Sequence, residues 1–209
     1  FEIVDFNKKI FRKLQEDDHS THVMILDKEK SFKDGYFSMQ KGLPSSSKSI
    51  YKGFLLSAGF LFAESEMVEQ VPYDPNLYFE GEETTMALRL FTNGFDIFHI
   101  PRIPLFHCYV DYSNEAKRPM HWNEEENKDR TVKWQELQSR SKERISKIIT
   151  GDMKGSFGLG LDRSLDDYKE LSGIDIKNRK VIDEDKAFTF KKLFETDWKT
   201  VAKKKNFLW

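Results

Sequence analysis

Three glutamates, Glu80, Glu82 and Glu83, surround Gly81 in the stretch YFEGEETTMALRLFTNGFDIFHI, which covers residues 78–100. Carboxylates grouped in this way can hold a substrate hydroxyl and accept its proton. Glycine between them would let the backbone come close to a ligand, because glycine has no side chain. The same acids could instead stabilise the start of a helix, where the macrodipole favours negative charge. A reactive site and a well-capped helix are therefore both open interpretations of this stretch.

Few other residues could do comparable chemistry. His107, in PRIPLFHCYV, could bind a metal ion or transfer protons, although a lone histidine on a strand is more often structural. Asp183-Glu184-Asp185 has D-x-D spacing, but no apolar strand leads into it, and we interpret it as a solvated turn. Cys108 is the only cysteine, which excludes an internal disulfide and a cysteine-only zinc site.

Hydrophobic periodicity predicts the elements that must position these residues. A helix over 83–92 follows the acids and should stop at Gly94 in the left-handed conformation. The polar run 27–53, with Gly42 and Pro44, predicts a loop. Further helices are predicted over 3–16, ESEMVEQV, 123–150 and RSLDDYKELSG, and further strands over HVMIL (22–26), FLLSAGFLFAES (54–65), FDIFHI and PLFHCYV.

The mixture of strands and helices predicts an α/β fold. We expect residues 1–176 to form part of one domain and residues 177–209 to form a helical tail, with Phe188, Phe190, Phe194 and Trp198 on its apolar face. The number of predicted strands is low for a complete doubly wound sheet, so we expect upstream sequence to complete the fold.

The net charge of -1 on 209 residues gives no global field that would attract nucleic acid or an anionic membrane. No apolar run is long enough to cross a bilayer. We therefore expect neither nucleic acid nor a membrane as a partner.

Four stretches, in this order and spacing, resemble the GlcNAc-type glycosyltransferase family, which includes a cytoplasmic hydroxyproline N-acetylglucosaminyltransferase. They are SAGFLF, VPYDPNLYFEGEETTMALRLFTNGFDIFHIP, FHCYVDY…KRPMHW and GLGLDRSLDDYKELSGID, and they cover most of residues 54–176. The pattern F-x-G-E-E-x-x-M-A-x-R-L-x-T-x-G is long enough to be specific. A weaker likeness extends to the polypeptide N-acetylgalactosaminyltransferases, which share the GT-A architecture.

The resemblance implies the C-terminal, acceptor-side half of a GT-A domain, because the D-x-D motif of this family lies upstream of the matched region. It also implies residue roles. Glu82 and Glu83 would be catalytic, and His107 would bind a divalent cation, Mn²⁺ or Mg²⁺. Ala58, Gly59, Gly81, Arg118 and Trp122 would bind the donor, with Arg118 and Trp122 on a loop over the diphosphate.

The function implied is transfer of a sugar, N-acetylglucosamine or another hexose, from a UDP-sugar to a protein or peptide hydroxyl with retention of configuration. A bound cation would neutralise the charge that develops on the leaving diphosphate. The alternative is a non-catalytic module of the same fold that binds carbohydrate or protein. The resemblance implies a cytoplasmic location.

Overall fold

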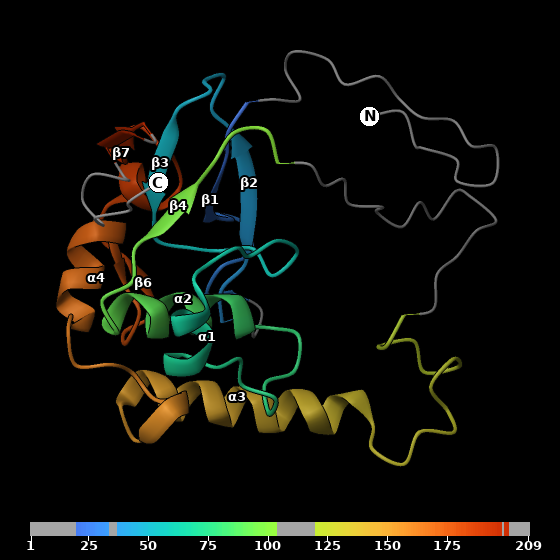
Figure 1. Cartoon of the computed structure of the whole chain (residues 1–209). Helices are drawn as coiled ribbons and strands as arrows, with labels where there is room; N and C mark the ends of the chain where they lie inside the picture. Colours follow the sequence, from blue (N-terminus) through green and yellow to red (C-terminus); the bar gives the residue numbers. More distant parts are fainter. Residues whose placement is uncertain (1–19, 34–36, 104–119, 198, 201–209) are drawn as a thin grey trace, which may run out of the picture.

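The computed structural model describes residues 20–33, 37–103, 120–197 and 199–200 (Figure 1). Within them helices and strands are mixed, which confirms the α/β class predicted from the sequence. The predicted helix over 3–16, the predicted strand PLFHCYV, and residues His107 and Arg118 lie outside this part of the chain.

Most strands lie in the upper half of Figure 1, and all strands pair antiparallel in the part of the chain that the structure describes. One pair contains β1 (His22–Leu26) and β2 (Gln40–Pro44). A three-stranded sheet has β3 (Ile50–Gly53) between β4 (Ile97–His99) and β7 (Phe194–Thr196). A second pair of strands consists of β5 (Ile174–Asp175) and β6 (Lys180–Val181).

Strands β2 and β3 contradict the loop predicted over 27–53. Gly42 and Pro44 suggested irregular structure, but both lie on β2, an edge strand whose residues are mostly accessible. Proline is tolerated on an edge strand because no neighbour needs its missing N–H. The strand predicted over 54–65 is also wrong for the described chain: β3 ends at Gly53, and the next element is α1 (Ser65–Gln70).

Helix α2 (Glu82–Thr92) lies at the centre of the molecule, between the strands and helix α3 (Trp134–Thr150) in Figure 1. It begins one residue earlier than predicted, and the chain turns at Gly94 with φ of 83°, as predicted. Every residue from 84 to 92 is buried, so α2 has no solvated face over this range.

Two hydrophobic clusters explain why α2 is enclosed. Leu88 and Phe91 belong to the main core, and Met86, Ala87 and Leu90 pack with α1 in a smaller cluster on another side. The main core contains Val23, Ile25, Leu26, Phe37, Tyr51, Phe54, Leu55, Leu88, Phe91, Ile145, Ile149, Tyr168, Ile174, Ile176, Ala187 and Leu193. Full burial of one Val, Leu, Ile or Phe side chain stabilises the fold by roughly 1.5–3 kcal/mol.

Arg89 is the largest polar side chain in this interior, with 1% of its surface exposed. Its guanidinium donates to the carbonyl oxygens of Pro72 (2.8 Å) and Ser156 (2.6 Å), and its Cζ lies 5.6 Å from the centre of the Phe157 ring. Burial lowers its pKa from the usual value. Arg89 therefore ties two loops to α2, and the Arg-Leu of the sequence pattern has a structural role.

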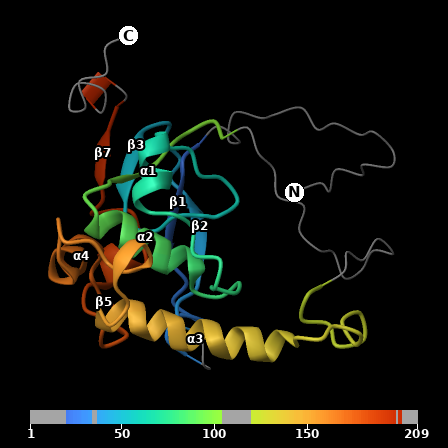
Figure 2. The same ribbon diagram turned by 60° about the horizontal axis from the view of Figure 1, so that its bottom comes forward.

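Helix α3 is shorter than the predicted helix over 123–150. The side chain of Asn123 accepts from the N–H of Glu125 (3.0 Å), and Asn127 donates to the carbonyl oxygens of Met120 and Asn123. Asparagine side chains that bond nearby backbone groups favour turns over helix. The helix consequently starts only at Trp134 and runs along the lower face of the molecule in Figure 2.

The helical tail expected over 177–209 is wrong for the described residues of that range. Helix α4 (Leu165–Ser172) is followed by β5, β6, the single turn α5 (Glu184–Ala187) and β7. Strand β7 pairs with β3, Ala187 is fully buried, and the Phe190 ring packs edge-on against Tyr51 at 5.7 Å. This segment completes the main core instead of forming a separate element.

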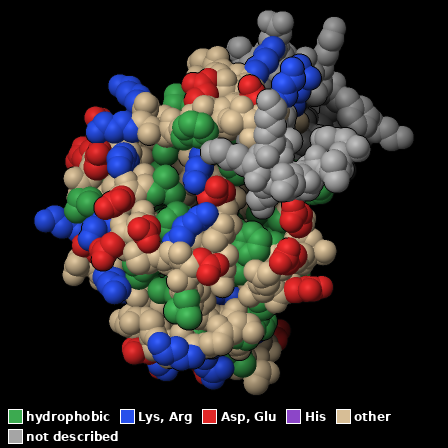
Figure 3. All heavy atoms as spheres, turned by 60° about the vertical axis from the view of Figure 1, so that its left-hand side comes forward, with side chains coloured by type: hydrophobic (Ala, Val, Ile, Leu, Met, Phe, Trp, Pro, Cys, Tyr) green, Lys and Arg blue, Asp and Glu red, His purple; other side chains and the backbone are tan. Residues whose placement is uncertain are grey.

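None of the helices in the described ranges is both long and apolar enough to cross a membrane. The face shown in Figure 3 carries basic and acidic side chains interspersed with one another, as the net charge of -1 suggests.

His99 on β4 is a buried imidazole that depends on Gly53. A Cβ at position 53 would lie 2.2 Å from His99 Cε1, so only glycine leaves room for the ring. His99 Nε2 donates to the Leu55 carbonyl oxygen at 2.9 Å, whereas the buried Nδ1 has no partner in the described part of the chain. Burial lowers the pKa of His99 to about 4 from 6.5, so the ring is neutral at pH 7.

Acid should therefore destabilise the protein through His99. The folded-state pKa lies below the unfolded one, so the stability is complete above pH 6.5 and is lost as the pH falls toward 4. Urea unfolding across this window measures this effect. The free energy of unfolding should fall by up to about 3 kcal/mol more in the wild type than in His99→Gln, whose amide can still donate to the Leu55 carbonyl but does not titrate. Parallel losses in the two proteins would contradict this prediction.

Candidate functional site

The site predicted from the sequence lies where the chain enters α2. Gly81 precedes the helix with φ of 81°, a left-handed conformation that favours glycine. A Cβ at this position would also lie 2.5 Å from Ile145 Cδ1 on α3. Gly81 thus has a structural reason to be glycine, and its predicted contact with the donor stays a prediction.

Glu80 is buried, with 8% of its surface exposed, and its carboxylate connects two segments. Its Oε1 accepts from the backbone N–H of Phe37 at 2.7 Å, and its Oε2 accepts from Gln138 Nε2 on α3 at 2.9 Å. Lys142 Nζ lies 3.9 Å from the same Oε2. A buried carboxylate with both oxygens bonded acts as a structural anchor.

Glu83 also has both oxygens occupied. Its Oε1 accepts from the backbone N–H of Ala58 at 2.6 Å, and its Oε2 accepts from Gln40 Nε2 at the start of β2. Ala58 and Gly59, the two predicted donor-binding residues, lie in an exposed turn in which the Phe60 N–H reaches the Ser57 carbonyl at 3.3 Å. Glu83 therefore holds this turn against the start of α2.

Glu82 differs from its two neighbours. Its carboxylate is half-buried and accepts no N–H donor from the described residues, and the exposed residue Tyr73 brings its hydroxyl near enough to affect the pKa of Glu82. Burial and the adjacent Glu83 raise the pKa of Glu82, and the hydrogen bond from Tyr73 offsets part of this effect. Burial, together with the charges of Glu82 and Glu83, raises the pKa of Tyr73 to about 12. Glu82 is consequently the acid of this group that is available for a substrate.

Trp122 lies next to the same motif. Its ring centre is 5.4 Å from that of Phe79 and 4.4 Å from that of His121. Phe79, which directly precedes Glu80, has a φ of 55° and 61% of its surface exposed. Trp122 is thus placed beside the acidic motif, while its contact with a donor stays a prediction.

The metal site predicted from the sequence involves His107, which lies outside the described residues together with Arg118. Within the described ranges no three His, Cys, Asp or Glu side chains lie close enough together to hold a metal ion. The geometry on which the predicted roles of His107 and Arg118 depend is therefore not part of the described structure.

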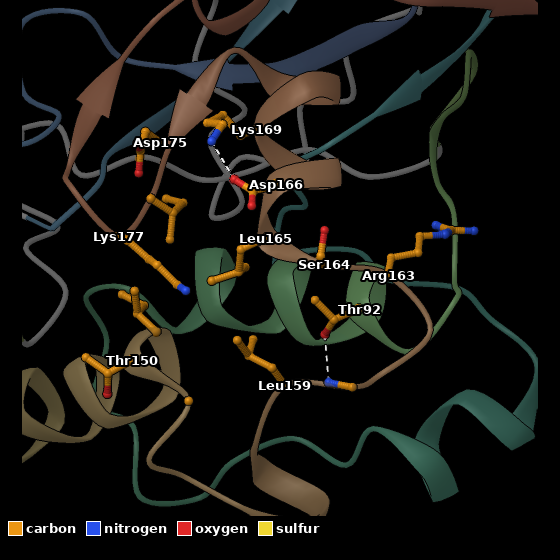
Figure 4. A pocket seen from close by; sticks show the side chains of 14 residues that line it. Thr92, Thr150, Leu159, Arg163, Ser164, Leu165, Asp166, Lys169, Asp175 and Lys177 are labelled. Carbon is orange, nitrogen blue, oxygen red and sulfur yellow. Dashed lines mark hydrogen bonds and ion pairs between the residues drawn. The ribbon is translucent and has the colours of Figure 1, made fainter.

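A separate open pocket of about 240 Å³ lies at the other end of α2 (Figure 4). Thr92, the last residue of α2, forms one wall, and its hydroxyl accepts from the Gly160 N–H at 2.8 Å. Asp166 and Lys169 on α4 pair with each other at its rim. The remaining lining residues are Ile149, Thr150, Gly151, Leu159, Gly160, Arg163, Ser164, Leu165, Asp175, Ile176 and Lys177. None of the catalytic, donor-binding or metal-binding residues predicted from the sequence lines this pocket.

Two residues of the acidic site were missed in the sequence. Tyr73 was given no role, and Gln40 stood in a predicted loop. Their contacts join positions far apart in the chain, and no periodicity or local motif marks them.

Comparison with known proteins gives one family. A family model described as Glycosyltransferase (GlcNAc) matches residues 11–178, well over half of the 209 residues. Neither the curated proteins nor the solved structures contain a match to this chain.

The different anchoring of Glu82 and Glu83 predicts different effects on stability. Glu83→Ala should lower the free energy of unfolding by about 1–3 kcal/mol, because the Ala58 N–H and the Gln40 amide lose their acceptor. Glu82→Ala should leave it unchanged or raise it slightly, since a carboxylate whose pKa is raised on folding costs stability at neutral pH. Urea unfolding at pH 7.5 measures both variants, and an equal loss in both would contradict the assignment.

Proposed function

The chain belongs to the GlcNAc glycosyltransferase family, and we propose that it transfers a sugar from a UDP-sugar to a protein or peptide hydroxyl, with Glu82 as the acid–base residue. The observation that carries this assignment is the contrast among the three acids. Glu80 and Glu83 accept N–H donors at both oxygens, and Glu82 keeps an accessible carboxylate of raised pKa.

Glu82 would act on the acceptor. Its carboxylate accepts a hydrogen bond from the acceptor hydroxyl, and it takes the hydroxyl proton as the new glycosidic bond forms and the bond to UDP breaks. A raised pKa brings the carboxylate closer to the pKa of an efficient base near neutral pH. The Tyr73 hydroxyl limits the rise of this pKa.

The turn at Ala58 and Gly59 would receive the donor. Its backbone is held through Glu83, and both residues are exposed, so a ligand could approach them closely. We propose UDP-N-acetylglucosamine as the donor, with retention of configuration, on the basis of the family. Gly81, Arg118 and Trp122 complete the proposed donor site, and the guanidinium of Arg118 would bind phosphate in a bidentate manner.

The described residues do not fit a divalent cation, because both oxygens of Glu80 and of Glu83 already accept N–H donors and no group of three described His, Cys, Asp or Glu side chains lies close enough together to hold one. The proposal that Mn²⁺ or Mg²⁺ binds depends on His107 and on upstream sequence that would complete the fold in the GT-A manner.

The poor fit of the described residues to a cation favours a second candidate, a non-catalytic module that binds carbohydrate or protein. Calorimetric titration with UDP and with protein-linked N-acetylglucosamine distinguishes the two: the enzyme should bind UDP and release it in turnover, whereas the module should bind only the glycan or the protein. A cytoplasmic location also belongs to this proposal and follows from the family resemblance alone.

Replacing Glu82 by Gln tests the enzyme. Transfer of labelled N-acetylglucosamine by the intact protein should fall at least about 100-fold, because the amide cannot accept the acceptor proton. Glu136→Gln is the matched control, since Glu136 also lies in the first turn of a helix but pairs with Arg140. A Glu82→Gln variant as active as this control would exclude the proposed role.

Tyr73→Phe should change the pH dependence of transfer. Loss of the hydrogen bond that lowers the pKa of Glu82 should raise that pKa further. Because Glu82 must be ionised to accept a proton, the acid limb of the profile of kcat against pH should move to higher pH. Tyr78→Phe, whose hydroxyl bonds His121, should leave the limb in place. A limb that stays or moves to lower pH in Tyr73→Phe would be inconsistent with a bond between Tyr73 and the base.

A further inference from the structure

Segment 37–40 is attached to the acidic motif by three successive contacts. The Phe37 N–H donates to Glu80, the Ser38 and Thr84 hydroxyls lie 2.5 Å apart, and Gln40 donates to Glu83. The first two contacts already join this segment to the start of α2. The third joins it to Glu83, whose other oxygen accepts from the backbone N–H of Ala58.

Gln40 holds two groups with one nitrogen. Its Nε2 donates to the Leu56 carbonyl oxygen at 2.5 Å and also to Glu83 Oε2. The other oxygen of Glu83 accepts from the Ala58 N–H. The backbone is therefore tied on both sides of Ser57, at the carbonyl before it and at the N–H after it, through one amide and one carboxylate.

Fold stability alone does not account for this amide. Both partners of Nε2 are acceptors, so the orientation of the amide is fixed, and Oε1 is buried without a donor in the part of the chain that the structure describes. An unsatisfied buried oxygen is costly, and such groups concentrate where function requires them. Strand β2 is meanwhile held by its pairing with β1, in which Gln40 lies opposite Leu26.

We propose that Gln40 is a positioning residue that acts through Glu83 to fix the turn at Ser57, Ala58 and Gly59 in the conformation that binds the UDP-sugar. This inference rests on the proposed function, in which that turn receives the donor. Gln40 does not touch the substrate. It removes the cost of ordering the turn when the donor binds, and preorganisation of this kind increases affinity.

The proposal predicts a particular kinetic change in Gln40→Met, which keeps the length of the side chain and removes the amide. The KM for the UDP-sugar should rise about 10-fold, while kcat and the KM for the acceptor should change less than about twofold, because binding of the donor is weakened equally before and during the reaction. Loss of Glu82 instead lowers kcat. Should Gln40→Met fail to fold, Gln40→Asn keeps the amide but cannot span both acceptors, and the same change is expected.

Gln138→Met is the matched control. Gln138 Nε2 also donates to a buried glutamate, Glu80, at 2.9 Å, but it lies on α3 and does not reach the turn. It should weaken folding to a similar degree and leave the donor KM unchanged. Equal donor KM values in the Gln40 and Gln138 variants would overturn the proposal.

Hydrogen exchange gives a readout that needs no activity. The Ala58 N–H donates a hydrogen bond to Glu83. Its hydrogen should exchange at least about 10-fold faster in Gln40→Met than in the wild type, and it should exchange at the wild-type rate in Gln138→Met. Unchanged protection of Ala58 would show that Gln40 does not hold the turn and would sink the proposal. A wild-type protein that neither binds nor turns over a UDP-sugar would instead refute the proposed function, and the role in donor binding would fall with it, even if the exchange rates differed as expected.

Discussion

Two anchored carboxylates at the entrance to α2 determine how the surrounding segments are arranged. A carboxylate that leaves water must find donors, and the penalty for leaving one unpaired is several kcal/mol. Glu80 and Glu83 meet this requirement with N–H groups from four residues that lie far from these acids in the sequence: Phe37, Gln40, Ala58 and Gln138. Because these donors must converge on two side chains, the strand β2, the turn after β3 and helix α3 are fixed relative to α2.

Residues of the later stretch GLGLDRSLDDYKELSGID secure the other end of the same helix. Arg163, just before α4, donates to the Gly94 carbonyl at 2.8 Å and pairs with Asp96, and its guanidinium lies over the Phe91 ring at 4.9 Å. Tyr168 on α4 donates to the Phe54 carbonyl at 2.8 Å. Together with the contacts of Glu80 and Glu83, these contacts hold the buried helix α2 at both ends.

Local signals in the sequence were sufficient for the elements that they specify. The acids and Gly94 located α2, and the periodicity of RSLDDYKELSG located α4, whose start Ser164 and Asp167 cap in a reciprocal box. Elements whose existence depends on a distant partner were missed. Strand β7 forms because β3 is present, and β2 is a strand despite Gly42 and Pro44 because β1 lies beside it. The positions of Tyr73 and Gln40 at the site could not be predicted for the same reason, since each contact joins parts of the chain that no window of sequence contains.

The adjacency of the three acids is itself a consequence of geometry. Residues one apart on a helix point about 100° away from each other, so Glu82 and Glu83 cannot face the same group even though they are neighbours. Glu83 points toward Ala58 and Gln40, and Glu82 is left beside Tyr73. Gly81, in the left-handed conformation, reverses the chain just before the helix and directs Glu80 toward Phe37 and α3. A capped helix and a reactive site are thus not competing interpretations of this motif. Anchoring two of the acids is what keeps the helix start rigid, and a rigid helix start is what gives the third acid a defined position and a perturbed pKa.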